Sequence, residues 1–167
     1  NLKIPKTTLS SFDSELLKID EEFFNWLKKE RYRQNKKIKD FLRRRSNAVD
    51  RFIIDLWQES NLNQDNQLGL FAVGGYGRRE LHPHSDIDLL ILSSTDITQN
   101  TAVKIEKLIQ HLWDQGLSIG HSVRTLEEAK KQCKLDVTAL TNILESRVLS
   151  GDIEIVTLLG ILNSKLF

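Results

Sequence analysis

Residues 70–92 read Leu70-Phe-Ala-Val-Gly-Gly-Tyr-Gly-Arg-Arg-Glu-Leu-His-Pro-His-Ser-Asp-Ile-Asp-Leu-Leu-Ile-Leu92. An apolar segment leads into a glycine turn, a polar excursion follows, and a second apolar segment begins with two aspartates. In an extended chain the side chains alternate between faces, so Asp86 and Asp88 project from the same face and can bring two carboxylates to one point. The stretch therefore predicts two strands with an acidic pair where the second begins.

The acidic pair suits a hard divalent cation. Mg²⁺ prefers oxygen ligands, keeps several waters and is typically held by one or two carboxylates plus substrate phosphates. Ordinary turn and capping roles explain the pair less well, because it leads into a strand that is apolar on both faces, where unpaired charge costs free energy. We therefore predict a nucleotide site in which Asp86 and Asp88 are the catalytic and metal-binding residues, with Mg²⁺ as the ion and Mn²⁺ as the alternative.

The glycine turn predicts a backbone that binds phosphate. Gly74 and Gly75 follow the first apolar segment directly, and without Cβ atoms they allow a sharp turn that brings N–H groups close to a ligand. The turn is not a dinucleotide-binding fingerprint, because Glu80 stands at its last position, and no Gly-Lys-Ser/Thr follows as in a P-loop. Ser85 can either orient Asp86 through its hydroxyl or simply finish the turn that precedes it.

Three segments of the chain resemble one known family. They are Val73-Gly-Gly-Tyr-Gly-Arg78, Ser85-Asp-Ile-Asp-Leu-Leu90 and Gly120-His-Ser-Val-Arg-Thr125. Their sequences are similar to those of the bacterial protein-PII uridylyltransferase/uridylyl-removing enzymes, within the DNA polymerase β-type nucleotidyltransferase superfamily. The resemblance implies an α+β fold: a polymerase β-type core with a small mixed sheet flanked by helices, here preceded by two long helices, and with its active site at the mouth of the first two strands.

The resemblance also implies a reaction. UMP would pass from UTP to a tyrosine hydroxyl of the PII nitrogen-signalling protein, with release of pyrophosphate. The nucleotide-binding candidates are Gly74, Gly75, Arg78 and Ser85. The family usually has Gly-Arg-Gly-Glu where this chain has Gly-Arg-Arg-Glu, so Arg78 inherits the expectation of a phosphate contact and Arg79 does not. A surface pair partnered by Glu80 is the alternative role for these arginines.

The usual third carboxylate of polymerase β-type enzymes is missing from the expected place. In that family the third carboxylate lies on a later strand of the sheet. In this chain the corresponding strand, predicted over 117–125, shows His121, Ser122 and Arg124 but no acid. Asp136 is the substitute candidate for a metal ligand, although its place before an apolar pattern favours a helix N-cap. Two other functions stay open: transfer to another acceptor, such as glutamine synthetase, a small molecule or an RNA end, and a non-catalytic nucleotide sensor.

Apolar spacing predicts the helices around this core. Two long helices precede the signature, the first capped by Ser11, and we divide the chain into an N-terminal helical segment, 1–66, and a nucleotidyltransferase core with C-terminal helices, 67–167. Asn100 is expected to cap a crossover helix, and Thr125 to open the next one with a capping box.

The end of the chain is predicted to be helical. One helix is expected after Asp136 with Glu145 and Arg147 as an ion pair on its surface, stopped by Gly151. A last apolar helix is expected over 152–166.

Composition sets further limits. Lys plus Arg number 24 and Asp plus Glu 23, so the net charge does not indicate a particular class of binding partner. The single cysteine, Cys133, and the absence of a signal peptide or membrane-spanning run predict a cytoplasmic protein without a membrane partner. The basic segment around Arg43-Arg-Arg45 is interpreted as a solvated helix face, which disfavours nucleic acid as a partner. The chain contains no Met, and it is predicted to be the transferase part of a longer chain whose hydrolytic HD and ligand-sensing ACT domains lie outside it.

Overall fold

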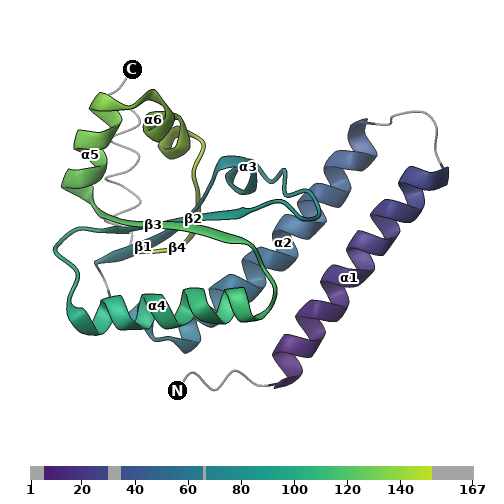
Figure 1. Ribbon diagram of the computed structural model, residues 1–167, viewed down its shortest axis with the longest axis horizontal. Helices are drawn as coiled ribbons and strands as arrows, with labels where there is room; N and C mark the ends of the chain where they lie inside the picture. The colour runs from purple at the N-terminus through teal and green to yellow at the C-terminus, as the bar shows by residue number, and fades with distance from the viewer. Residues whose placement is uncertain (1–5, 30–34, 66, 152–167) are drawn as a thin grey trace.

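The computed structural model describes residues 6–29, 35–65 and 67–151 (Figure 1). Two long helices come first, and helices and strands then alternate along most of the remaining chain. The elements are α1 (Lys6–Lys29), α2 (Asn35–Glu59), the short 3-10 helix η1 (Leu62–Gln64), β1 (Leu68–Val73), α3 (Gly74–Gly77), β2 (Ile87–Ser93), α4 (Gln99–Asp114), β3 (Ile119–Thr125), α5 (Leu126–Leu135), α6 (Val137–Leu144) and β4 (Arg147–Gly151).

The strands form one four-stranded mixed sheet in the order β3-β2-β1-β4. β1 lies antiparallel to both β2 and β4, whereas β2 and β3 are parallel and are joined through the crossover helix α4. The last residue of β1, Val73, pairs with Asp88 near the start of β2. The predicted α+β fold with two preceding long helices is confirmed.

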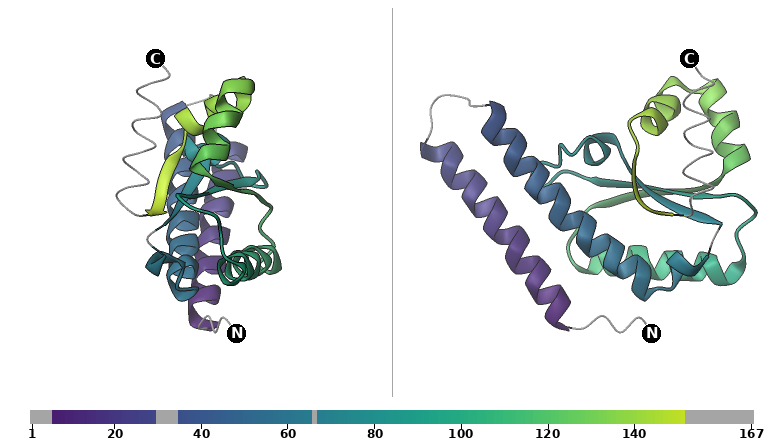
Figure 2. Two further views of the ribbon diagram at one scale, coloured as in Figure 1. Left: turned by 90° about the vertical axis from the view of Figure 1, so that its left-hand side faces the viewer. Right: turned by 180° about the vertical axis from the view of Figure 1, so that it is seen from behind.

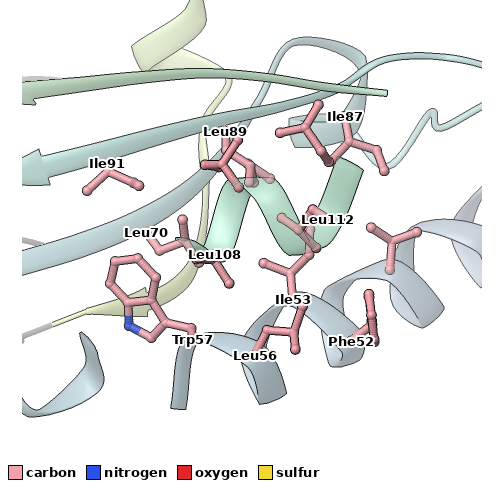
Figure 3. Packing of buried hydrophobic residues seen from close by; sticks show 14 of the residues in the cluster. Phe52, Ile53, Leu56, Trp57, Leu70, Ile87, Leu89, Ile91, Leu108 and Leu112 are labelled. Carbon is pink, nitrogen blue, oxygen red and sulfur yellow. The ribbon is translucent and has the colours of Figure 1, made fainter. Parts of the chain in front are cut away.

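The two faces of the sheet carry separate apolar cores. On one face, Leu70 and Ile91 pack with residues of α2 and α4, including the fully buried Trp57 (Figure 3). On the other face, Phe71 and Leu90 pack with residues of α5 and α6. Figure 2 shows the long helices and α4 on one side of the sheet and α5 and α6 on the other. Alternation along β2 places Asp88 on the same face as Leu90, the face that α5 and α6 cover in part.

Two predicted helix starts are wrong, and a third is confirmed. Helix α1 begins at Lys6, so Ser11 lies inside it; the helix continues through this position because its face packs on α2, where the rings of Phe12 and Phe52 stack. Helix α4 is capped by Thr98, not Asn100, because the Thr98 hydroxyl accepts from the Thr101 N–H at 3.2 Å. The predicted capping box at the start of α5 is present in full.

The strand β4 was not predicted. The apolar spacing predicts one helix up to Gly151, but α6 ends at Leu144 and the chain then pairs with β1. The expected ion pair between Glu145 and Arg147 is wrong, because each side chain has a partner elsewhere: Glu145 pairs with Arg78 and Arg147 with Asp50. Tertiary pairing has overridden the helical pattern here. The helix predicted over 152–166 lies outside the described residues.

The basic segment of α2 faces α1 as well as solvent. Arg44 pairs with Glu22 at 2.7 Å, and Arg45 lies 3.3 Å from Asp20. Arg45 is only 8% exposed, so the prediction of a solvated face is wrong for this residue, whose charge serves the contact between the two helices. None of the helices in the described ranges is long and apolar enough to cross a membrane.

Candidate active site

Asp88 lies against two glycines, and a Cβ atom at either position would crowd its carboxylate. Its Oδ2 is 3.3 Å from the position that a Cβ atom would take at Gly74, and its Oδ1 is 2.5 Å from the corresponding position at Gly120. Gly74 also has φ of +61°, a left-handed conformation that glycine adopts without strain. The Asp88 carboxylate is therefore held where β1 ends and β3 begins, and an open pocket lined by Val73, Gly74, Asp88, Leu89, Gly120, His121, Ser122 and Asn142 surrounds it.

The electrostatics of the pair call for a cation. Loss of solvation, and then the nearby charge of Asp86, raise the pKa of Asp88 above its ordinary value. Within the described part of the chain, neither carboxylate forms an ion pair with a basic side chain. A divalent cation would reverse both unfavourable effects, since it favours the ionised form of each carboxylate. The residues present thus fit the magnesium site expected from the sequence.

The hydroxyl that orients Asp86 comes from Ser118 rather than Ser85. Ser118 Oγ donates to Asp86 Oδ1 at 2.5 Å, and the Ile87 N–H donates to the Ser118 carbonyl at 2.8 Å. Ser85 instead finishes the preceding turn, where its N–H donates to the His82 carbonyl. Sequence reasoning missed Ser118 because its proximity depends on the parallel register of β2 and β3, which no local pattern encodes.

Arg78 is held by two carboxylates. Its Nε lies 3.1 Å from Glu80 and its Nη1 lies 2.6 Å from Glu145, at the end of α6. The alternative role given to Arg78, a surface pair with Glu80, is therefore present, and a second acid has been added to it. Through Glu145 the side chain links the glycine turn to α6, across the face of the sheet that carries Asp88.

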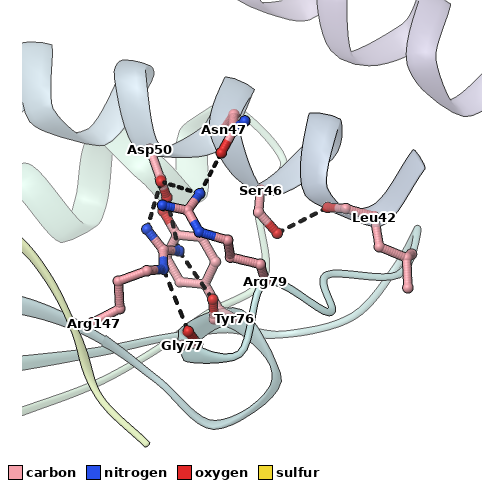
Figure 4. A network of polar contacts seen from close by, with 8 residues as sticks. All are labelled: Leu42, Ser46, Asn47, Asp50, Tyr76, Gly77, Arg79 and Arg147. Carbon is pink, nitrogen blue, oxygen red and sulfur yellow. Dashed lines mark hydrogen bonds and ion pairs between the residues drawn. The ribbon is translucent and has the colours of Figure 1, made fainter. Parts of the chain in front are cut away.

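A polar network fixes the glycine turn to α2 and β4 (Figure 4). Tyr76 Oη donates to Asp50 Oδ1 at 2.6 Å, and Arg147 donates to both oxygens of the same carboxylate, at 2.5 and 3.1 Å. Arg147 also donates to the carbonyls of Tyr76 and Gly77 at 3.0 and 3.3 Å. Arg79 donates to Asn47 Oδ1, and its guanidinium lies 3.5 Å from Asp50 Oδ2.

Asp50 is the centre of this network and was not a sequence candidate. Asp50 is 9% exposed, and Tyr76 is fully buried. Burial, and then the Asp50 carboxylate, raise the pKa of Tyr76, so its hydroxyl remains a donor. Only its position in an apolar stretch of α2 could have marked Asp50 from the sequence. The network holds α3 in place through two charged side chains from distant segments, Asp50 of α2 and Arg147 of β4.

Asp136 is not brought to the acidic pair. Its side chain accepts from the Thr138 N–H at 2.8 Å and caps α6, as the alternative reading of the sequence predicted. No group of three or more His, Cys, Asp or Glu side chains suited to a metal occurs in residues 6–29, 35–65 and 67–151. The described site therefore offers two carboxylates, which leaves the remaining metal positions to substrate phosphates and water.

The fold and this site define a class of protein. A family model described as the nucleotidyltransferase domain matches residues 59–150, more than half of the chain, and the chain belongs to that family. The match covers β1, the glycine turn, the acidic pair and β3, which are the elements that build the pocket around Asp88.

Relatives narrow the similarity further. The chain is 40% identical over 130 residues to the bifunctional uridylyltransferase/uridylyl-removing enzyme of Photobacterium profundum, and 44% identical over 115 residues to that of Pasteurella multocida. These alignments cover 78% and 69% of this chain but only 15% and 13% of the relatives. The chain thus spans a small part of the length of the proteins that it matches.

A solved structure is also similar, though loosely. It is titled "Crystal structure of the toxin-antitoxin with AMP-PNP" and has a TM-score of 0.41 with 18% sequence identity. The superposition covers 64% of this chain and 81% of that one.

Gly120→Ala should weaken nucleotide binding while leaving the stability of the fold nearly unchanged. The new Cβ would lie 2.5 Å from Asp88 Oδ1, so the carboxylate must rotate away, whereas the backbone of β3 can stay where it is. We expect magnesium-dependent nucleotide binding to weaken by at least about tenfold, the effect of roughly 1.4 kcal/mol, with little change in thermal stability. Calorimetric titration and a melting curve measure the two. A melting temperature that falls as much as binding does would contradict this expectation.

Proposed function

We propose that this chain is the nucleotidyltransferase part of a uridylyltransferase, which transfers UMP from UTP to a tyrosine hydroxyl of the PII signalling protein and releases pyrophosphate. The observation that carries the proposal is the uncompensated Asp86 and Asp88 pair beside the glycine turn, in a chain of the nucleotidyltransferase family. The names of the relatives support uridylyl transfer. The cytoplasm as its compartment and the division at residue 66 remain parts of the same proposal.

Each candidate residue has a task in this proposal. Asp86 and Asp88 would bind Mg²⁺, or Mn²⁺ as the alternative, and the metal would neutralise charge on the phosphates when bound. The N–H groups at Gly74 and Gly75 would position the outer phosphates. Ser85 closes the turn before the pair. The sequence predicts that Arg78 contacts phosphate directly. Its ion pairs with Glu80 and Glu145 instead support a role in holding the glycine turn in place. A phosphate could bind Arg78 only by displacing one of these two carboxylates.

The chemistry is a displacement at phosphorus. The acceptor hydroxyl oxygen would form a bond to the α-phosphorus of UTP while the bond from that phosphorus to the bridging oxygen breaks, so that pyrophosphate leaves and the hydroxyl loses its proton. There is little covalent work for the protein, and catalysis in such reactions is mostly positioning and electrostatic stabilisation. A rigid glycine turn and a fixed pair of carboxylates are the features that this demands.

The decisive experiment is a calorimetric titration of the four ribonucleoside triphosphates into the chain, with and without Mg²⁺. The Asp86→Ala/Asp88→Ala double variant is the comparison. We expect UTP to bind best, and only when both the metal and the aspartates are present; transfer of a labelled uridylyl group to PII is then the second assay. Binding without pyrophosphate release in the presence of PII would identify a nucleotide sensor, and equal binding of all four triphosphates would remove the uridylyl specificity.

A further inference from the structure

A second pocket adjoins the one around Asp88 on the same face of the sheet. The two share Val73, Ser122 and Asn142 as lining residues. The second pocket extends from these shared residues towards α5 and α6, and its volume is about 110 Å³. Among the described residues, its lining is Val73, Leu90, Ser122, Arg124, Ala129, Gln132, Ala139, Asn142 and Ile143.

The polar side chains of this pocket have no partners among the described residues. Arg124, Gln132 and Asn142 are all partly buried, yet no hydrogen bond or ion pair of their side chains occurs within the described ranges. Arg124 differs in this respect from the other arginines of those ranges, each of which lies within 4.0 Å of a carboxylate; they are Arg43, Arg44, Arg45, Arg51, Arg78, Arg79 and Arg147. Donors that line a pocket without a partner among the described residues are available to a ligand that supplies the acceptors.

The size and chemistry of the pocket fit a single flat ring. An apolar cavity of about 150 Å³ takes benzene, so a pocket of about 110 Å³ that is open to solvent has room for at most one six-membered ring and is too small for a purine. Leu90, Ala129 and Ile143 provide apolar surface for the faces of a ring. A triphosphate would need several cations, and Arg124 is the only basic residue in the lining that the described ranges provide.

The pocket also lies at the right place relative to the acidic pair. In the parallel register, Gly120 stands beside Asp88, Ser122 beside Leu90 and Arg124 beside Leu92. At about 3.3 Å per residue, Arg124 is roughly 13 Å along β3 from Gly120. A nucleotide whose α-phosphate lies at Asp88 would thus place its ribose beside Ser122 and the far edge of its base towards Arg124.

We infer that this pocket binds the pyrimidine ring of the nucleotide, and that Arg124 selects uracil over cytosine by donating to the O4 carbonyl. O4 is on the edge of the ring opposite the glycosidic bond, which is the edge that faces Arg124. A guanidinium only donates hydrogen bonds, whereas cytosine presents an amino donor at the same position. The carboxamides of Gln132 and Asn142 can both donate and accept, so they hold the ring without deciding its identity. This inference rests on the proposed function.

Arg124→Gln tests the inference, because an amide can turn to serve either base. The chain is titrated with UTP, with CTP and with a ribose 5-triphosphate that lacks a base, each with Mg²⁺. A hydrogen bond to a charged group contributes about 1.5–3 kcal/mol, so we expect UTP binding to weaken roughly 10- to 100-fold and CTP binding to change little. The baseless triphosphate should bind the variant as it binds the parent. Arg43→Gln, an exposed change outside both pockets, is the matched control and should alter none of the three.

The outcomes separate this inference from the proposed function. Equal weakening of all three ligands in Arg124→Gln would make Arg124 a phosphate ligand and overturn the inference, as would an unchanged preference for UTP. If the parent chain binds UTP and the baseless triphosphate equally, with dependence on Mg²⁺ and Asp88, the base pocket is refuted while the nucleotide site stands. Absence of magnesium-dependent binding of any triphosphate would refute both.

Discussion

Asp88→Asn is expected to lower the rate of nucleotidyl transfer by about 10³-fold or more. The carboxylate lies between Gly74 and Gly120 beside Asp86, and an amide there removes half of the charge that would hold the metal. Losing a single electrostatic contact to a transition state typically costs 10²–10³-fold in rate, and losing a metal ligand costs at least as much. Transfer of labelled UMP to PII, measured at saturating Mg²⁺, gives the rate.

The matched control is Asp96→Asn, an exposed change in the loop after β2. It removes the same charge from the surface and should leave transfer within about twofold of the parent, since surface changes away from a site have small effects. An Asp88→Asn variant that transfers at near the parental rate would refute the role of Asp88 and, with it, the proposed metal site.

Asp88→Asn is also expected to be more stable than the parent in the absence of metal. Burial and Asp86 raise the pKa of Asp88 in the folded chain, so ionisation of Asp88 opposes folding. The penalty is absent below the carboxyl's ordinary pKa and is complete above the raised folded value. In EDTA the free energy of unfolding of Asp88→Asn should therefore exceed that of the parent at pH 7, and the difference should shrink as the pH falls through that window. Urea denaturation at several pH values would show a constant difference if this account were wrong.

Asp50→Ala is expected to lower the free energy of unfolding by about 3–5 kcal/mol, the usual cost of breaking a buried ion pair by removing one partner. Arg147, whose side chain is 17% exposed, would keep its charge without a carboxylate. The Tyr76 hydroxyl would lose its acceptor at the same time. Urea denaturation at pH 7 gives the change directly, and because native domains are stable by only about 5–15 kcal/mol, the variant should be only marginally folded.

Two milder variants make the result specific. Tyr76→Phe removes one hydrogen bond and should cost about 1 kcal/mol, while Asp55→Ala, an exposed change on the same helix α2, should cost less than about 0.5 kcal/mol. A loss below 1 kcal/mol in Asp50→Ala would show that the network contributes little to folding and that the glycine turn is held by other contacts.

Local patterns in the sequence predict the centre of this molecule well. Alternation and the glycine turn placed β1 and β2, and put Asp86 and Asp88 where the second strand begins, because both signals lie within one short segment. The capping box at Thr125 was readable for the same reason. The α+β fold followed from the family resemblance, and the assignment of roles to the acidic pair remains a prediction.

Long-range contacts account for what the sequence did not show. Ser118 meets Asp86 across 32 positions of sequence, through a strand register that composition does not set. The strand β4 forms because β1 offers a free edge, although residues 137–149 carry a helical pattern. The pocket at Arg124 required five elements, β1, β2, β3, α5 and α6, to be placed together. In each case packing between distant segments overrides or completes the local preference.

The ion pair between Asp50 and Arg147 also bears on how the chain folds as it is synthesised. The two residues are 97 positions apart, and at about 5–20 residues per second the ribosome needs roughly 5–20 s to pass from one to the other. Until Arg147 emerges, Asp50 and the Tyr76 carbonyl lack the side chain that joins them, and the Gly74–Gly77 turn has only part of its support. The Gly74–Gly77 turn therefore gains its full support only after β1, β2 and β3, the strands that line the pocket around Asp88, have already been made.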